Sequence, residues 1–172
     1  MKNNKINSGG FYKKRRKEMS NGGNSIPISF ESLERVAKEK LKAGPYGYTA
    51  GGAGAELTMK SNRRELDRYH IVPRILRDVS RIDMRIQLFG KMHQTPLILA
   101  PIGSQRMYHP DGELGTARAA MKQNVPITLS TWSSTPLEMV ADVMGEVAKF
   151  FQLYWLNDWE VTASFASRAE KA

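Results

Sequence analysis

The sequence contains no cysteine, and none of its apolar runs approaches the length needed to cross a membrane. The absence of cysteine excludes disulfides, thiolate metal sites and cysteine nucleophiles, and it is typical of a cytoplasmic protein. The N-terminus lacks the apolar core of a signal peptide, so secretion is not expected. The three histidines, His70, His93 and His109, lack the spacing of paired metal ligands. We therefore expect a cytoplasmic protein with no metal site and no membrane span.

Acidic residues are scarce at one end of the chain. Residues 1–27 contain seven Lys or Arg and one Glu, so they carry +6 of the total charge of +9. The other 145 residues carry only +3, which argues against nucleic-acid binding by the protein as a whole. Residues 1–27 are also rich in Asn, Ser and Gly and show no periodic apolar face. We expect them to form a disordered basic tail that limited proteolysis removes first.

The other residues have the composition of a globular protein, since the chain is 41% hydrophobic and 25% charged. The first region, residues 28–95, is predicted to form helices followed by a small hairpin. Its first helix is capped by Ser29 and ends at Gly44-Pro45, and the glycine-rich run that follows is interpreted as a tight turn beside Tyr48. The remaining predicted elements of this region are a helix at 56–68 and two paired strands at 83–88 and 92–95.

The second region, residues 96–172, repeats a strand followed by a helix three times. Its first strand is a continuous apolar run ending at Pro101, which is typical of a strand buried on both faces. Thr135 and Glu138 have capping-box spacing, with Pro136 at the first helical position. The predicted strands are 96–101, 125–130 and 147–154, and the predicted helices start near 111, 135 and 157. The helix stripes expected to face the sheet are Leu114, Ala117, Ala120 and Met121, then Leu137, Val140, Ala141 and Met144, then Val161, Phe165 and Ala169.

Three strand–helix units imply an α/β protein whose parallel sheet has right-handed crossovers. The periodicity is compatible with a doubly wound sheet and with the opening third of a (β/α)₈ barrel, and both alternatives remain open at this point. In either fold, ligands bind at the carboxyl ends of the strands.

Polar and aromatic residues gather at these predicted strand ends. They are Gly103 and Ser104 after the first strand, Ser130, Thr131 and Trp132 after the second, and Gln152, Tyr154 and Trp155 at the third. Such a rim suits a planar, hydrogen-bonding heteroaromatic ligand, although each residue taken singly also fits a strand-end cap or core packing. His109 precedes Pro110 in a predicted loop and has no evident carboxylate partner, so we expect it to have a structural role and not to act as a base.

Six motifs then make the chain recognisable. They occur in this order between residues 48 and 155: Tyr48-Thr-Ala-Gly-Gly-Ala-Gly54, Pro73-Arg-Ile-Leu-Arg-Asp-Val79, Leu99-Ala-Pro-Ile-Gly103, His109-Pro-Asp-Gly-Glu113, Leu129-Ser-Thr-Trp-Ser-Ser-Thr-Pro-Leu-Glu138 and Phe150-Phe-Gln-Leu-Tyr-Trp155. On these motifs the chain, from about residue 29 to 172, resembles the FMN-dependent 2-hydroxy acid oxidases. It is most similar to the branch of lactate oxidase and lactate 2-monooxygenase.

The resemblance implies a (β/α)₈ TIM barrel with FMN at its carboxyl rim, preceded by the capping helices and hairpin of residues 28–95. It implies that FMN is bound by Pro101, Ile102, Gly103, Ser130 and Gln152. It places Tyr48, Trp132 and Tyr154 around a small (S)-2-hydroxy acid such as lactate. The acid is oxidised to the 2-oxo acid, and oxygen reoxidises the flavin.

The resemblance also implies that part of the machinery comes from later strands. In this family the histidine base and the phosphate loop lie beyond the third strand–helix unit, so we expect residues 96–172 to be the first three units of an incomplete barrel. The chain by itself is then expected to be inactive and to need a C-terminal half-barrel partner or a homo-oligomer. The alternative is a catalytically inactive remnant, and an open reading frame for the missing half directly downstream would distinguish the two.

Overall fold

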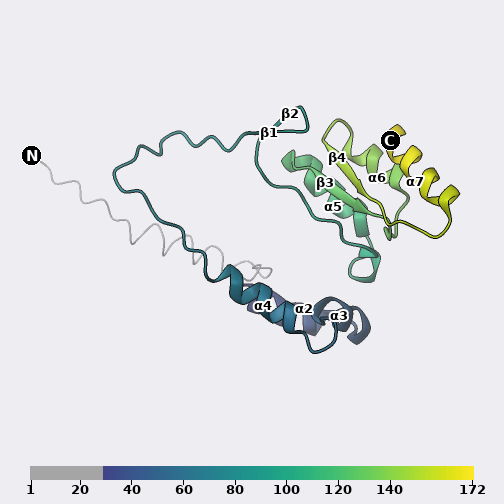
Figure 1. Ribbon diagram of the computed structural model, residues 1–172, viewed down its shortest axis with the longest axis horizontal. Helices are drawn as coiled ribbons and strands as arrows, with labels where there is room; N and C mark the ends of the chain where they lie inside the picture. The colour runs from purple at the N-terminus through teal and green to yellow at the C-terminus, as the bar shows by residue number, and fades with distance from the viewer. Residues whose placement is uncertain (1–28) are drawn as a thin grey trace, which may run out of the picture. The chain divides into compact units, whose positions relative to one another are not determined.

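A computed structural model describes residues 29–172 (Figure 1). The prediction of a disordered tail at residues 1–27 lies outside the described residues. The chain divides between Glu56 and Leu57 into two compact units, which are described separately below. The domain boundary predicted between residues 95 and 96 stays a prediction. No helix of the described part is long and apolar enough to span a membrane.

The first unit holds two helices, α2 (Phe30–Lys40) and α3 (Ala43–Ala50). Ser29 caps α2 as predicted, because its hydroxyl accepts a hydrogen bond from the Ser32 N–H at 3.1 Å. The first helix ends at Lys40 and not at Gly44-Pro45 as predicted. Gly44 and Pro45 lie inside α3, which continues to Ala50, so the turn predicted to follow them is wrong for residues 46–50. Proline is tolerated in the first turn of a helix, where its missing N–H has no intrahelical acceptor.

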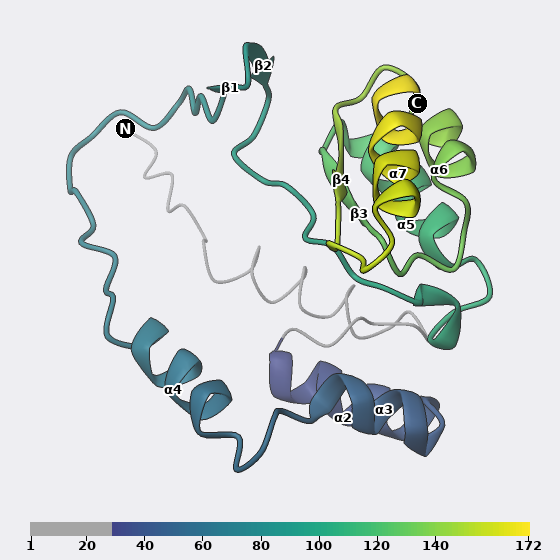
Figure 2. The ribbon, with the colours of Figure 1, turned by 45° about the vertical axis from the view of Figure 1, so that its right-hand side comes forward.

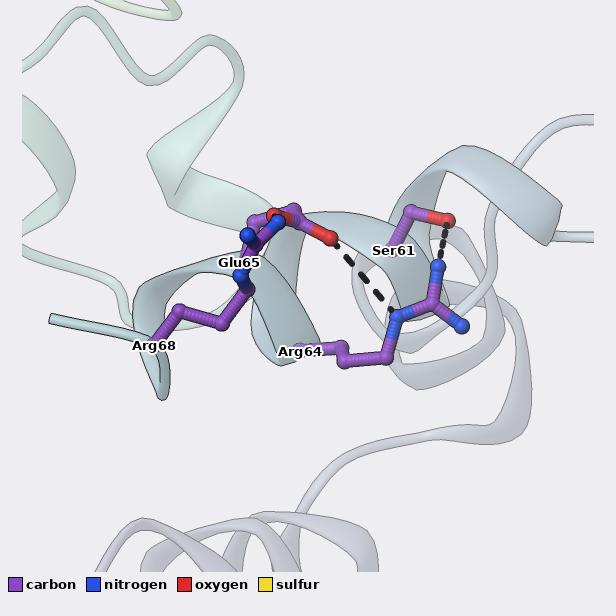
Figure 3. A network of polar contacts seen from close by, with 4 residues as sticks. All are labelled: Ser61, Arg64, Glu65 and Arg68. Atoms are coloured by element: carbon purple, nitrogen blue, oxygen red, sulfur yellow. Dashed lines mark hydrogen bonds and ion pairs between the residues drawn. The ribbon is translucent and has the colours of Figure 1, made fainter.

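The second unit begins with α4 (Leu57–Leu66), which confirms the helix predicted there. Figure 3 shows its polar side chains. Arg64 donates to Ser61 Oγ at 3.2 Å, and Arg68 donates to Glu65 Oε2 at 2.7 Å. Glu65 is about half exposed and both arginines are more exposed than that, so these contacts add little to stability. No residue of α4 is buried.

The predicted hairpin is confirmed, with shorter strands than expected. Strands β1 (Ile86–Leu88) and β2 (Lys91–His93) pair in antiparallel fashion. The two turn residues, Phe89 and Gly90, have φ angles of 49° and 75°. Positive φ at both central residues is characteristic of the type I′ turn, whose twist matches that of the flanking strands. The Phe89 ring packs edge-on against Phe150, with ring centroids 5.4 Å apart.

A parallel sheet forms the centre of the second unit. Strands β3 (Ile127–Ser130) and β4 (Lys149–Gln152) pair in register from Ile127↔Lys149 to Ser130↔Gln152. The predicted strand at 96–101 is reduced to a single parallel bridge between Leu99 and Ile127. It is not buried on both faces either, since Leu97 is 62% exposed. Within the described residues β3 is its only neighbouring strand, so this apolar segment is not covered as a central strand would be.

Three helices follow these strands, namely α5 (Gly112–Gln123), α6 (Leu137–Met144) and α7 (Trp159–Lys171). All three lie on the same face of the sheet in both ribbon views (Figures 1 and 2). The predicted α6 stripe is confirmed, because all four of its residues are buried. Met121 and Val161 are exceptions to the predicted stripes, at 43% and 41% exposed. The core consists of Ala117, Ala120, Ile127, Leu129, Leu137, Val140 and Met144, with Phe151 and Phe165 packed against it.

The start of α6 differs from the prediction. The Thr135 hydroxyl caps no helix N–H and instead donates to Glu113 Oε2 at 2.9 Å, so the predicted capping box is wrong. Glu138 is held by Arg168 of α7 through two hydrogen bonds of 2.7 and 2.9 Å. Both capping-box side chains are therefore taken by distant partners. The start of α7 lies close to the predicted residue 157, and Asp158 caps this helix by accepting from the backbone N–H groups of Glu160 and Val161.

Candidate functional site

The carboxyl ends of β3 and β4 bring together a hydroxyl and an amide. Ser130 and Gln152 are partners in the register, and Ser130 Oγ donates to Gln152 Oε1 at 3.2 Å. Side chains alternate along a strand, and Ile127 and Leu129 face the helices. Ser130 and Gln152 therefore lie on the opposite face of the sheet. No described residue accepts a hydrogen bond from Gln152 Nε2, so this amide can donate to a ligand.

Thr131 locks the two strand ends together just beyond this pair. Its hydroxyl donates to the carbonyl oxygen of Gln152 at 2.5 Å and accepts from the Tyr154 N–H at 3.0 Å. The backbone N–H of Thr131 also donates to the Gln152 carbonyl. Because β4 ends at Gln152, it is this hydroxyl that positions the backbone of Tyr154, and not further strand pairing. Sequence reasoning named Thr131 among the rim residues but assigned it no role.

The loop after Leu99 lies directly against the loop after β3. The Ser104 N–H donates to the Trp132 carbonyl at 2.8 Å. A Cβ atom at Gly103 would lie 3.1 Å from Trp132 Cβ and 3.3 Å from its carbonyl oxygen. This spacing is tighter than an ordinary van der Waals contact, so glycine at 103 lets the two backbones approach closely.

The structure thus gathers five of the eight predicted site residues. Gly103, Ser130, Trp132, Gln152 and Tyr154 are linked by the contacts above. Pro101 and Ile102 precede Gly103 in the same loop and are exposed. Tyr48 lies on α3 in the other unit, where it is 77% exposed.

Sequence reasoning missed Glu113, which lies in the first turn of α5 and is only 1% exposed. Its Oε1 atom accepts from the backbone N–H groups of Gln105 and Ser134 at 3.0 and 2.9 Å. Its Oε2 atom accepts from the hydroxyls of Ser134 and Thr135 at 2.7 and 2.9 Å. The signal in the sequence was an acid in the first turn of a helix, which also fits a simple favourable interaction with the helix dipole.

Glu113 makes the stability of this region depend on pH. Burial disfavours its charged form, but the hydrogen bonds from Ser134 and Gln105 outweigh burial and lower the pKa of Glu113 from 4.5 to about 2. A carboxyl whose pKa is lower in the folded state stabilises the fold above its unfolded pKa, and that contribution is lost as the pH falls towards its folded pKa.

We therefore expect the free energy of unfolding of Glu113→Gln to be roughly 1–2 kcal/mol lower than that of wild type at pH 7. This difference should disappear as the pH falls from 5 to 2. Urea denaturation at several pH values measures the difference. Glu138→Gln is the control. The pKa of Glu138 is also lowered to about 2, mainly by side-chain hydrogen bonds from Arg168. Unlike Glu113, however, this carboxyl is about half exposed. A difference in the free energy of unfolding that stays constant with pH would contradict the assignment of a lowered pKa to Glu113.

The three histidines add no base to the rim. His109 Nδ1 accepts from the Asp111 N–H at 3.2 Å, in the turn that leads into α5. His93 lies in β2, and His70 lies in the irregular segment after α4. Within residues 29–172, no group of three His, Asp or Glu residues could hold a metal ion.

Comparisons with known proteins match most of this chain. The family described as FMN-dependent dehydrogenase matches residues 37–172. The L-lactate oxidase of Lysinibacillus sphaericus (strain C3-41) is 47% identical over 147 residues, which cover 86% of this chain and 38% of that protein. The 4-hydroxymandelate oxidase of Amycolatopsis orientalis is 41% identical over 145 residues, covering 84% of this chain and 40% of that protein. The chain thus spans about two fifths of the length of these curated relatives.

Solved structures give the same result. The crystal structure of mandelate oxidase has a TM-score of 0.78 and is 39% identical, covering 85% of this chain and 42% of that one. A mandelate oxidase variant whose structure holds a C4a-OH-FMN adduct has a TM-score of 0.76 at 39% identity, covering 81% of this chain and 42% of that one. With a family match that covers most of its residues, the chain belongs to the FMN-dependent dehydrogenases, a family whose cofactor is FMN.

Proposed function

We propose that this chain supplies the flavin-ring and substrate contacts of an enzyme that oxidises a small (S)-2-hydroxy acid, of the size of lactate, to the 2-oxo acid. Oxygen is the proposed electron acceptor. The observation that carries the proposal is the pairing of Ser130 and Gln152 at the ends of two parallel strands. The relatives are named as oxidases of lactate, 4-hydroxymandelate and glycolate, which are all 2-hydroxy acids.

The finer fold that we propose is the opening part of a (β/α)₈ barrel. Right-handed crossovers place consecutive helices on one face of a sheet while the strand order runs in one direction, and on both faces once it reverses. Here α5, α6 and α7 all pack on one face of β3 and β4. This supports a barrel over a doubly wound sheet, and it turns Ser130 and Gln152 towards the barrel interior.

The donors at the strand ends fit a flavin ring. The Ser130 hydroxyl donates to the side-chain oxygen of Gln152, so the amide N–H groups of Gln152 are available to donate to the ring. An isoalloxazine ring presents carbonyl oxygens and ring nitrogens that accept such bonds, and when bound it supplies the two-electron acceptor that this oxidation needs. In this proposal the backbone at Pro101, Ile102 and Gly103 runs beside the ring.

The substrate side of the proposal consists of aromatic residues. Trp132 and Tyr154 follow the two strand ends and are 64% and 49% exposed, so their side chains are available to a ligand. We assign the Tyr154 hydroxyl to the substrate carboxylate or hydroxyl, and Trp132 to the wall of the pocket. Tyr48 is assigned to the same substrate. The base that takes the substrate proton is assigned to a segment outside these 172 residues, on a C-terminal half-barrel.

Two substitutions test these roles in a complex of this chain with the remaining half of a related barrel. Tyr154→Phe should lower kcat/KM for lactate by about 10- to 100-fold and leave the flavin bound, since a hydrogen bond to a charged group is lost. Gln152→Ala should weaken FMN binding by about 5- to 10-fold because ring hydrogen bonds are lost. Steady-state kinetics and flavin fluorescence titration measure the two effects.

Tyr69→Phe and Gln123→Ala are the matched controls, because both residues are exposed and neither lies at a strand end. Neither control should change kcat/KM or the Kd for FMN. The opposite result, with Tyr154→Phe losing flavin and Gln152→Ala losing only turnover, would mean that the two residues serve the other ligand. A complex that binds no FMN would contradict the proposed function itself.

A further inference from the structure

We infer that Glu113 is a positioning residue of the rim. Its carboxylate holds two loops in one arrangement, and thereby sets Gly103 against Trp132. The first loop is residues 101–107, which ends in the short 3₁₀ helix η1 (Gln105–Met107), and the second is residues 131–136. The inference rests on the proposed function only in taking this rim as the surface that faces FMN and substrate.

Both carboxylate oxygens of Glu113 accept hydrogen bonds from these loops. Oε1 accepts one backbone N–H from each loop, Gln105 from the first and Ser134 from the second. Oε2 accepts the hydroxyls of Ser134 and Thr135, so it fixes the second loop just before α6. One buried side chain therefore satisfies backbone donors from two loops that are 29 residues apart in the sequence.

Two further hydrogen bonds carry this connection along the rim. The Arg106 N–H donates to Ser134 Oγ at 3.2 Å, and the Ser104 N–H donates to the Trp132 carbonyl at 2.8 Å. The second of these bonds lies beside Gly103, at the close approach described above. A shift of either loop at Glu113 would therefore move Gly103 relative to Trp132.

Packing does not supply an alternative way of holding these loops. Ile102 is 56% exposed, Met107 is 45% exposed and Trp132 is 64% exposed. Loops with few buried apolar contacts open locally unless hydrogen bonds hold them. Apart from the Thr116 hydroxyl, which donates to Gln105 Oε1 at 2.6 Å, the hydrogen bonds that tie both loops to α5 converge on one carboxylate.

The chemistry of the contacts predicts how substitutions rank. Glutamine keeps the length of the side chain and can keep both backbone bonds on Oε1, while the hydroxyls of Ser134 and Thr135 rotate to accept from its amide. Aspartate keeps the charge but is one methylene shorter, so it cannot reach both loops. Alanine leaves two backbone N–H groups without an acceptor. The rim should therefore loosen least with glutamine, more with aspartate and most with alanine.

Amide hydrogen exchange of the full 172-residue chain, followed by NMR, tests this ranking without any ligand. In Glu113→Ala, the amides of Ser104, Gln105 and Ser134 should exchange about 100-fold faster than in wild type, and in Glu113→Gln about 10-fold faster or less. In Glu113→Ala, the amides of Thr128 in β3 and Val140 in α6 should accelerate only by the factor that the loss of global stability in urea denaturation explains, and therefore by less than the rim amides. Glu138→Gln is the matched control and should leave the rim amides unchanged.

A merely structural role would accelerate rim and core amides by the same factor, and that result would overturn the inference. So would rim amides that exchange at the wild-type rate in all three Glu113 variants. If Glu113→Ala and Glu113→Asp fail to fold, Ser134→Ala decides, because it removes only hydroxyl contacts. Ser134→Ala should accelerate amide exchange at Gln105 and Arg106 and leave it unchanged at Thr128. Unchanged exchange at Gln105 and Arg106 would contradict the inference.

A second measurement separates this inference from the proposed function. FMN titration of the barrel completed with the related half should give a Kd about 10-fold higher for Glu113→Asp than for wild type. If the exchange ranking holds but the wild-type complex binds no FMN, the proposed function fails and the positioning role stands. If the rim amides exchange faster in the variants but all variants bind FMN with the same Kd, Glu113 does not position the rim for flavin binding.

Discussion

When the 172-residue chain is mixed anaerobically with FMN and lactate, the flavin is expected to stay oxidised. Oxidation of a hydroxy acid needs a base within hydrogen-bond reach of the substrate hydroxyl. The three histidines of the sequence lie in β2, in the turn before α5 and in the segment after α4, and none follows the strand ends that hold Ser130 and Gln152. General-base catalysis contributes about 10²- to 10⁴-fold, so its absence should reduce the rate by at least that factor.

The loss of the visible absorbance of oxidised flavin measures this rate. Adding the remaining half of a related barrel should restore bleaching by lactate and strengthen flavin binding in the same sample. Stoichiometric bleaching by the chain alone would contradict the prediction and would direct attention to His109 as a base. If the completed barrel binds FMN but does not bleach, the alternative of a catalytically inactive remnant is favoured.

The second large effect is expected in the core beneath the strand ends. Met144 on α6 is fully buried and packs with Ile127, Leu129 and Val140. Met144→Ala should lower the free energy of unfolding by about 2–4 kcal/mol, because the lost apolar contacts are accompanied by a cavity that the surrounding residues fill only in part. Urea denaturation measures this change.

Met139→Ala is the matched control on the same helix, since Met139 is 47% exposed. It should change the free energy of unfolding by less than about 0.5 kcal/mol. Equal effects of the two substitutions would show that α6 does not pack on the sheet in the way described. Because β3 carries Ser130, loss of the Met144 contacts is also expected to disturb the strand end.

Local patterns in the sequence were enough to predict the elements whose stability comes from their own residues. The Ser29 cap, the hairpin of β1 and β2 and the four-residue stripe of α6 all depend on spacings of a few residues. Two of the wrong predictions involve distant partners. The Thr135 hydroxyl does not cap α6 because Glu113 accepts it, and the strand ending at Pro101 is short because it borders only β3 among the described strands.

The sequence by itself therefore determined the order of the strands and helices and the kinds of residue that follow each strand, and its motifs indicated the family. The tertiary structure decided which of those residues meet. It paired Ser130 with Gln152, joined Thr131 to Tyr154, and buried Glu113 between two loops that no periodicity connects. The physical reason is that these contacts depend on strand register and on the close approach of loops more than 20 residues apart. These contacts cannot be predicted from the spacing of residues along the chain.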